Sequence, residues 1–191
     1  MPSESFEKCL CEERVPKVGS LQIYVPSEGP IENFSSSLFS ADEIHKIAVL
    51  DLRLLNLDRN ACNILVQNSV DTATGVTTKK LVPIDHGLTI PDSLAIQSFD
   101  LAWLSFDQSE EPFSPKTLDY INRLDIDADI RLLEANFKIR AQCLRNMKIS
   151  TLLLKKAAAQ GLNLAQIGQI LCRPDDDEDA PSLLEKIVDK A

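Results

Sequence analysis

The chain has no long apolar run, few glycines and few aromatic residues, and these shortages limit what it can be. Of 191 residues, 6 are Gly and 5% are aromatic, whereas 44% are hydrophobic and 26% are charged, which is typical of a globular domain. No apolar stretch approaches the roughly 20 residues that cross a bilayer. The start of the chain has no basic region followed by an apolar core. We therefore expect neither a transmembrane segment nor a secretory signal.

Positive charge is also scarce. The chain has 20 Lys and Arg against 29 Asp and Glu, which gives a net charge of −9. General nucleic-acid binding depends on basic patches, so this composition argues against a nucleic-acid partner. It also argues against strong electrostatic attraction to an anionic membrane. We expect a cytoplasmic protein, with peripheral membrane contact at most.

The cysteines show neither the spacing of a zinc site nor that of a redox pair. Cys9 and Cys11 are too close for the usual pairing, and the total of 5 cysteines is odd, which disfavours a closed disulfide framework. We interpret the cysteines as reduced thiols. The acidic run at residues 175–179 is interpreted as a solvated linker and not as a metal site.

Two short clusters carry the functional signal. Residues 58–63 read Asp-Arg-Asn-Ala-Cys-Asn and precede an apolar run, and residues 85–87 read Asp-His-Gly and follow another. Phosphoryl transfer from ATP needs an acidic group at the attacking hydroxyl and oxygen ligands for Mg²⁺ on the phosphates. In kinases an Asp orients the hydroxyl, an Asn five positions later binds metal, and the Asp of an Asp-x-Gly triplet binds metal again. Asp58, Asn63 and Asp85 have this layout, with a predicted β-hairpin between the last two.

Each of these residues also has a structural interpretation. Asp58 would position the acceptor hydroxyl or take its proton, but a loop Asp paired with Arg59 is the alternative. Asn63 would be a metal ligand, or else an Asn in a turn before a strand. Asp85 would link Mg²⁺ to the β- and γ-phosphates. We assign Asp58, Arg59 and Asn63 to the catalytic group, with Arg59 bracing the loop rather than touching substrate, and Asn63 and Asp85 to the metal.

The predicted cofactors are ATP and Mg²⁺, or Mn²⁺ in its place, because carboxylate and amide oxygens suit a hard cation. Leu65 and Ile84 flank the motifs where the floor of an adenine pocket would lie, and core packing explains them equally well. With Asp85 they form the nucleotide-binding candidates. Gly87 provides the permissive backbone for a sharp turn after the metal ligand.

The order of residues within the motifs separates the kinase branches. Protein kinases place Arg before the catalytic Asp, whereas Arg59 follows Asp58 here. Asp-Arg, then Asn four positions on, then Asp-x-Gly resembles the phosphatidylinositol 3-/4-kinase superfamily. The flanking residues 45–53 and 81–87 resemble the type II-like gamma class of plant phosphatidylinositol 4-kinases. The resemblance covers roughly residues 19–173.

The resemblance implies an α+β fold, that of a protein-kinase-like C-terminal lobe, mostly helical with a small catalytic β-hairpin. It implies transfer of the ATP γ-phosphate to the inositol 4-hydroxyl of phosphatidylinositol. A protein Ser/Thr kinase of the same family is one alternative. A catalytically silent binding or regulatory module is another, because the first 40 or so residues hold neither a Gly-x-Gly loop nor a strand Lys. We therefore expect a fragment that lacks the N-terminal lobe.

Three further positions complete the prediction. Asn60 stands where the commoner superfamily loop has His, so any base role falls to Asp58. His86 stands where many kinases have Phe, and a His at this position resembles the gamma class. We interpret His45 as a surface residue on the polar side of its helix.

The segment 87–115 contains no Lys or Arg. The resemblance places the activation loop, which selects the acceptor, in this segment. Recognition of a phosphorylated headgroup would require cations. If the acceptor is a lipid, we therefore expect unphosphorylated phosphatidylinositol. Trp103 and Phe106 are expected to pack in the core rather than to enter a membrane.

Apolar spacing and capping residues predict three regions: a linker near the hinge at 1–40, the catalytic lobe at 41–173, and an acidic linker with a short helix at 174–191. Within them we expect six helices. The first is capped by Ser40 or Asp42, the second is opened by Ser114 and Pro115, and the third is started by Asp127, with a stripe of Ile130, Leu133 and Phe137. The fourth spans 139–160, the fifth is capped by Asn163 and the sixth spans 182–190, and strands are expected at 63–67 and 81–84.

Overall fold

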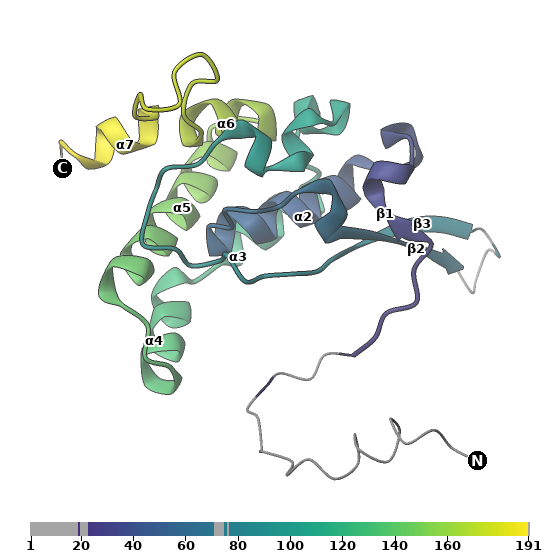
Figure 1. Cartoon of the computed structure of the whole chain (residues 1–191), viewed down its shortest axis with the longest axis horizontal. Helices are drawn as coiled ribbons and strands as arrows, with labels where there is room; N and C mark the ends of the chain where they lie inside the picture. Colours follow the sequence, from purple (N-terminus) through teal and green to yellow (C-terminus); the bar gives the residue numbers. More distant parts are fainter. Residues whose placement is uncertain (1–18, 20–22, 71–74, 76, 191) are drawn as a thin grey trace, which may run out of the picture.

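The computed structural model describes residues 19, 23–70, 75 and 77–190. Within these residues, helices surround the central helix α2, and a three-stranded antiparallel sheet lies at one end of it (Figure 1). None of the described helices is long and apolar enough to span a membrane. The elements are α2 (Ala41–Leu54), α3 (Pro115–Arg123), α4 (Ile126–Asn136), α5 (Ala141–Ala159), α6 (Leu164–Leu171), α7 (Leu183–Val188), β1 (Gly29–Pro30), β2 (Ile64–Val70), β3 (Thr77–Pro83) and short 3-10 turns, among them η3 (Ala61–Asn63), η4 (Ser98–Asp100), η5 (Ala102–Ser105) and η6 (Asp107–Glu110).

Helix α2 begins and ends as its sequence predicts. The Ser40 side chain accepts a hydrogen bond from the Glu43 backbone N–H, so Ser40 is the N-cap and Asp42 lies in the first turn. Acidic residues in the first turn also interact favourably with the helix dipole. The helix stops at Leu55, whose φ of 52° is left-handed. This stop turns the chain back along α2 and leads directly into the loop at residues 58–63.

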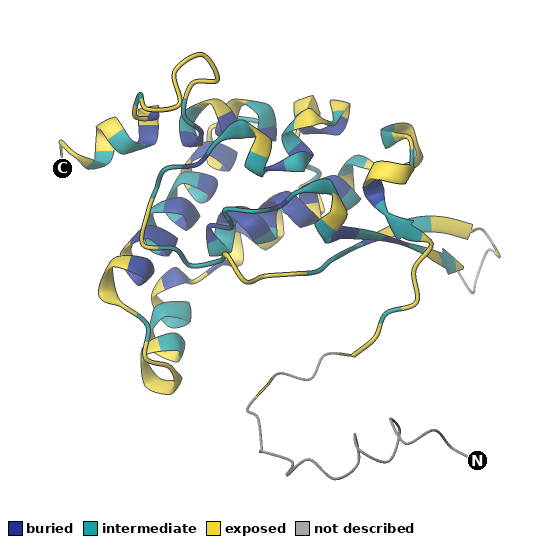
Figure 2. Ribbon diagram, in the orientation of Figure 1, coloured by how far each residue is buried: buried dark blue, intermediate teal, exposed yellow. Residues whose placement is uncertain are grey.

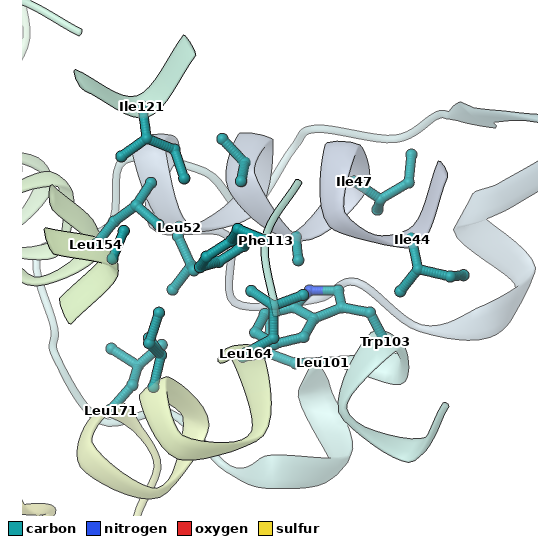
Figure 3. Close-up of a cluster of buried hydrophobic side chains, with 14 of the residues drawn as sticks. Ile44, Ile47, Leu52, Leu101, Trp103, Phe113, Ile121, Leu154, Leu164 and Leu171 are labelled. Atoms are coloured by element: carbon teal, nitrogen blue, oxygen red, sulfur yellow. The ribbon is translucent and has the colours of Figure 1, made fainter. Parts of the chain in front are cut away.

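The core forms where α2, α3, α5 and α6 meet. Buried positions follow α2 and the inner face of α5 (Figure 2). Trp103 is fully buried, and its indole lies between side chains of α2 and α6 (Figure 3). Phe106 is partly buried against the same cluster. The prediction that Trp103 and Phe106 pack in the core is confirmed.

Strands β2 and β3 form the predicted hairpin. They pair antiparallel from Ile64 opposite Pro83 to Val70 opposite Thr77. Both strands are longer than the apolar runs that predicted them, because backbone hydrogen bonds continue through polar residues. Ile64 and Val66 point into the core. The turn residues 71–74 and 76 lie outside the described residues.

The prediction that His45 is a surface residue is wrong. His45 is fully buried, and its Nε2 lies 2.8 Å from the Gln108 carbonyl oxygen. Its ring also meets the Phe113 ring edge-on, with 5.1 Å between centroids. The segment from η6 to Phe113 covers the side of α2 that looks polar in sequence. Contacts between residues so far apart in the chain are not visible in helical periodicity.

The start of α4 also differs from the prediction. Asp125, not Asp127, caps the helix, by accepting a hydrogen bond from the Ala128 backbone N–H. Of the predicted stripe, Ile130 and Leu133 are half-buried, but Phe137 is 61% exposed. Phe137 follows the last helical residue in extended conformation. Helical spacing therefore does not apply to it, and its inclusion in the buried stripe is wrong.

The cysteine prediction is tested only in part. Cys62, Cys143 and Cys172 are free. Cys9 and Cys11 lie outside the described residues.

The C-terminal helix α7 packs back on α6. Leu184 is buried in the common core, and Ser182 caps the helix. The Arg173 guanidinium donates to both oxygens of Glu185, at 2.8 and 3.0 Å. The acidic run at 175–179 is exposed. Among the described residues, no group of three or more His, Cys, Asp or Glu side chains could hold a metal ion.

The Arg173–Glu185 ion pair should make the docking of α7 depend on pH. Hydrogen bonds from Arg173 hold the pKa of Glu185 below its ordinary value of 4.5. The stabilisation is therefore fully present above the ordinary pKa of 4.5 and is lost as the pH falls through the lowered pKa of the folded state. Glu185→Gln should lower the free energy of unfolding by about 1 kcal/mol at pH 7. Urea unfolding of wild type and Glu185→Gln at pH 7 and at pH 3 measures the difference in the free energy of unfolding.

The control is Asp119→Asn, which breaks an exposed pair with Arg123 and should cost less than about 0.5 kcal/mol. The difference between wild type and Glu185→Gln should shrink at low pH, since Glu185 is then protonated in both states. A difference that stays constant down to pH 3 would contradict the assignment.

Candidate active site

Asn56 sets the start of the loop at residues 58–63. Its side-chain amide donates to Asp51 Oδ1 at 3.0 Å, and its side-chain oxygen accepts from the Asp58 backbone N–H at 3.0 Å. Leu57 donates its N–H to the Leu88 carbonyl at 3.1 Å. These bonds fasten the loop to the end of α2 on one side and to the segment after the Asp-His-Gly triplet on the other.

Arg59 joins the two sequence motifs and is fully buried. Its Nε donates to both carboxylate oxygens of Asp51 at 3.1 Å. Its Nη1 donates to the carbonyl oxygens of Asn63 and Ile84, at 2.8 and 2.6 Å, and its Nη2 lies 3.1 Å from His86 Nδ1. The ion pair is with Asp51, so the alternative in which Arg59 neutralises Asp58 does not occur. A bracing role for Arg59 agrees with these contacts.

Asp51, the buried partner of Arg59, is a residue that the sequence reasoning missed. It is buried, and burial raises its pKa, while the nearby Arg59 charge and hydrogen bonds from Asn56, Arg59 and Trp103 oppose that rise. The Trp103 indole N–H donates to Asp51 Oδ2 at 3.2 Å. The sequence did contain a signal that Asp51 is buried, because Asp51 falls on the same helical face as Ile44 and Ile47. A carboxylate within an apolar stripe requires a buried partner.

Asp58 is half-buried and is oriented by Asn60. The Asn60 amide donates to Asp58 Oδ1 at 2.8 Å, while its oxygen accepts from the Asn63 N–H at 3.2 Å. Asn60 therefore replaces the commoner His with a neutral group that both caps η3 and holds the acidic side chain. No histidine stands at this position to accept a proton.

A second carboxylate, Asp100, lies beside Asp58. The Arg59 N–H donates to the Asp100 carbonyl at 2.7 Å, and the Ala102 N–H donates to the Arg59 carbonyl at 2.8 Å. Burial raises the pKa of Asp100, a hydrogen bond from the Gln97 backbone opposes this, and the charge of Asp58 raises it further. The surroundings of Asp58 are therefore acidic. Sequence reasoning missed Asp100, because the two segments meet only in the fold.

The predicted metal ligands Asn63 and Asp85 stand at the same end of the hairpin. The Ile84 N–H donates to the Asn63 carbonyl at 3.0 Å. The Asn63 side-chain amide donates to the Asp58 carbonyl at 3.3 Å, which leaves its side-chain oxygen as the atom available for a cation. Asp85 follows β3 by two residues instead of ending it, and it is exposed.

The backbone at Asp85 has a left-handed φ of 48°. A positive φ is uncommon outside glycine, although Asp tolerates it better than most residues. Asp85 Oδ1 accepts a hydrogen bond from the Gly87 N–H at 3.2 Å. This local turn redirects the chain immediately after the hairpin and presents the carboxylate at the surface.

The donor set fits a nucleotide-bound Mg²⁺ better than a metal held by protein alone. Mg²⁺ keeps several waters and usually takes one or two protein oxygens together with substrate phosphates. Asn63 and Asp85 offer one amide and one carboxylate oxygen. The described residues include no cluster of three or more acidic or His and Cys ligands. Such a site would gain its metal with the nucleotide.

Leu65 and Ile84 lie outside the buried core. The core cluster takes Ile64 and Val66 from β2, whose side chains point to the face opposite Leu65. Leu65 and Ile84 are both half-buried. Neither belongs to the fully buried cluster, and their assignment to the floor of an adenine pocket stays a prediction.

The chain belongs to the phosphatidylinositol 3- and 4-kinase family, whose family model matches residues 3–167. It is 43% identical over 176 residues to phosphatidylinositol 4-kinase gamma 4 of Oryza sativa subsp. japonica, and this match covers 92% of the chain. It is 42% identical to phosphatidylinositol 4-kinase gamma 3 of Arabidopsis thaliana over 92% of the chain, and 39% identical to gamma 2 of the same plant over 97%. The resemblance seen in the two motifs is confirmed.

The chain spans only part of these relatives. The matched regions are 30%, 29% and 32% of the relatives' own lengths. Their names indicate a phosphotransferase, and the mixed helix and sheet fold is consistent with a C-terminal kinase lobe.

Proposed function

We propose that this chain carries the catalytic machinery of a phosphatidylinositol 4-kinase, which transfers the γ-phosphate of ATP to the inositol 4-hydroxyl. The observation that supports it most is the Arg59 side chain, which ties the loop of Asp58 and Asn63 to the segment of Asp85. Two motifs separated by the hairpin thus stand together in the fold. Membership of the family supports the same reaction.

In this proposal Asp58 holds the acceptor. Its carboxylate accepts a hydrogen bond from the inositol 4-hydroxyl. It takes the proton as the oxygen attacks the γ-phosphorus, while the bond from that phosphorus to the bridging oxygen breaks and ADP leaves. Asn60 keeps the carboxylate in place through its amide. Asn63 and Asp85 would hold Mg²⁺ with the nucleotide, and the bound cation supplies neutralisation of the phosphate charge.

The acceptor side favours an inositol ring that carries no phosphate monoester. Asp58 and Asp100 lie close together there, and the segment 87–115 offers no Lys or Arg. An inositol ring that already carries phosphate monoesters would bring further negative charge to this side and would find no Lys or Arg in the segment to bind it. The same segment exposes Leu88 by 56% and Phe99 by 68%, which suits a lipid acceptor at a membrane surface. We propose phosphatidylinositol as the substrate and a cytoplasmic, peripheral location.

The test is incorporation of labelled γ-phosphate into vesicles of phosphatidylinositol by the purified chain, with Mg²⁺ present. The product should be the 4-phosphate, identified by chromatography of the deacylated lipid. Vesicles of the 3- and 5-monophosphates, in which the 4-hydroxyl is still free, should give much less product. Asp58→Asn should lower the rate by about 100-fold, because the hydroxyl loses its proton acceptor.

Two outcomes would replace the proposal. Label in a protein acceptor such as casein but not in lipid would support a protein Ser/Thr kinase. The absence of label in either, together with no effect of Mg-ATP on the melting temperature, would support a silent binding module. A true binder at a hundred times its Kd should gain about 2.7 kcal/mol of stability.

A further inference from the structure

We propose that Asp51 is a positioning residue for the metal and nucleotide site. Its buried carboxylate orients Arg59 so that one guanidinium holds the two ligand-bearing segments together. This inference rests on the proposed function, since the site that it supports is the Mg-ATP site formed by Asn63 and Asp85.

Arg59 needs a buried counter-charge. Its side chain is fully buried, and Asp51 is almost as completely buried at 1% side-chain exposure. An unpaired charge in such a place is strongly unfavourable. Asp51 accepts from Arg59 Nε with both oxygens, and this leaves Nη1 and Nη2 directed at the two motifs.

The Nη1 nitrogen of Arg59 contacts the backbone of both ligand-bearing segments. Nη1 donates to the carbonyl of Asn63, a proposed ligand, and to that of Ile84, which precedes the other ligand Asp85. One nitrogen that bridges two carbonyls at 2.8 and 2.6 Å sets the separation of the two backbones. Catalytic sites need their ligands held within about 0.5 Å of the productive geometry. The carboxylate of Asp51 therefore controls ligand spacing without touching either ligand.

Asp51 also connects these segments to the rest of the lobe. It accepts hydrogen bonds from Asn56, at the start of the loop, and from Trp103, in the core. Replacement by Asn preserves the size of the side chain but removes the charge that pairs with Arg59. Arg59 would then rotate toward other acceptors, and its bridge between Asn63 and Ile84 would loosen.

The same helix offers a matched control. Arg53 and Asp129 form an ion pair, with Arg53 Nη2 2.7 Å from each Asp129 oxygen and Nε 3.0 Å from one of them. This pair joins α2 to α4 and is partly exposed, at 28% and 21%. It contacts neither motif. Asp129→Asn thus breaks an Arg–Asp pair on α2 without touching the proposed site.

The experiment measures binding of Mn²⁺ to the full chain at a fixed ATP concentration, by the loss of the free Mn²⁺ signal in electron paramagnetic resonance. Asp51→Asn should raise the apparent Kd for Mn²⁺ about 10- to 100-fold, as is usual when a supporting partner of a metal ligand is removed. Asp129→Asn should change it less than about twofold, since its loss does not move the ligands. Near-ultraviolet circular dichroism checks that each variant keeps its tertiary packing.

A second variant keeps the test decisive if Asp51→Asn does not fold. Arg59→Lys retains the buried positive charge beside Asp51, but a single ammonium cannot reproduce the planar fork. It should show the same loss of Mn²⁺ affinity. A folded Asp51→Asn or Arg59→Lys variant with wild-type affinity would overturn the positioning role. Absence of ATP-dependent Mn²⁺ binding in the wild type would instead count against the proposed function.

Discussion

Replacing Asp85 with Asn should lower phosphoryl transfer by about 1000-fold, the largest effect on activity that we expect. The carboxylate is exposed, lies just beyond the hairpin and is the only charged member of the proposed ligand pair. Loss of its charge removes the stabilisation of the phosphates while leaving a side chain of nearly the same shape. The measurement is the rate of labelled phosphate transfer to phosphatidylinositol vesicles.

The matched control is Asp127→Asn, which also removes one exposed carboxylate. Asp127 pairs with Lys148 at 2.6 Å and belongs to α4, at the opposite end of the lobe from the hairpin (Figure 1). Its activity should stay within about twofold of the wild type. Asp85→Asn should also lose ATP-dependent Mn²⁺ binding. Wild-type rates in a folded Asp85→Asn variant would remove Asp85 from the metal site.

Replacing Trp103 with Ala should cause the largest loss of stability, about 3–5 kcal/mol. Trp103 is fully buried where helices α2 and α6 meet, so the truncation leaves a large cavity. It also removes the indole N–H that donates to Asp51. The free energy of unfolding in urea measures the loss, and the cavity should make the transition less cooperative.

Two variants separate the causes of that loss. Trp103→Phe keeps most of the apolar volume but removes the donor to Asp51, and it should fall between wild type and Trp103→Ala. Phe99→Ala truncates an aromatic side chain of the same segment that is 68% exposed, and it should cost less than about 0.5 kcal/mol. A loss below about 1 kcal/mol for Trp103→Ala would show that this part of the core is not tightly packed.

Local signals in the sequence predicted several elements correctly. Ser40, Ser114 and Asn163 cap the helices that follow them. Each cap depends on a side chain and a backbone N–H three residues later, so a short stretch of sequence contains the whole interaction. The hairpin between Asn63 and Asp85 was predictable for a similar reason, since its two apolar runs are close in the chain.

Predictions failed where a residue's surroundings come from distant segments. His45 is buried because η6 and Phe113 cover it. Phe137 is exposed because the helix stops before it. Asp51 was overlooked because its partners, Arg59 and Trp103, lie on a later loop and a later turn. The apolar face of a helix can indicate that a polar group is buried, but its partners can be identified only when the segments that cover it are known.

The sequence by itself determined the family and the residues of the candidate site. The order of Asp58, Arg59 and Asn63, followed by Asp85 in an Asp-x-Gly triplet, is a property of the chain and needs no coordinates. Only the tertiary structure decided how the site is held. Arg59 links its two halves because burial makes a lone guanidinium too costly, and Asp51 and the backbone carbonyls are the acceptors that the fold brings within its reach.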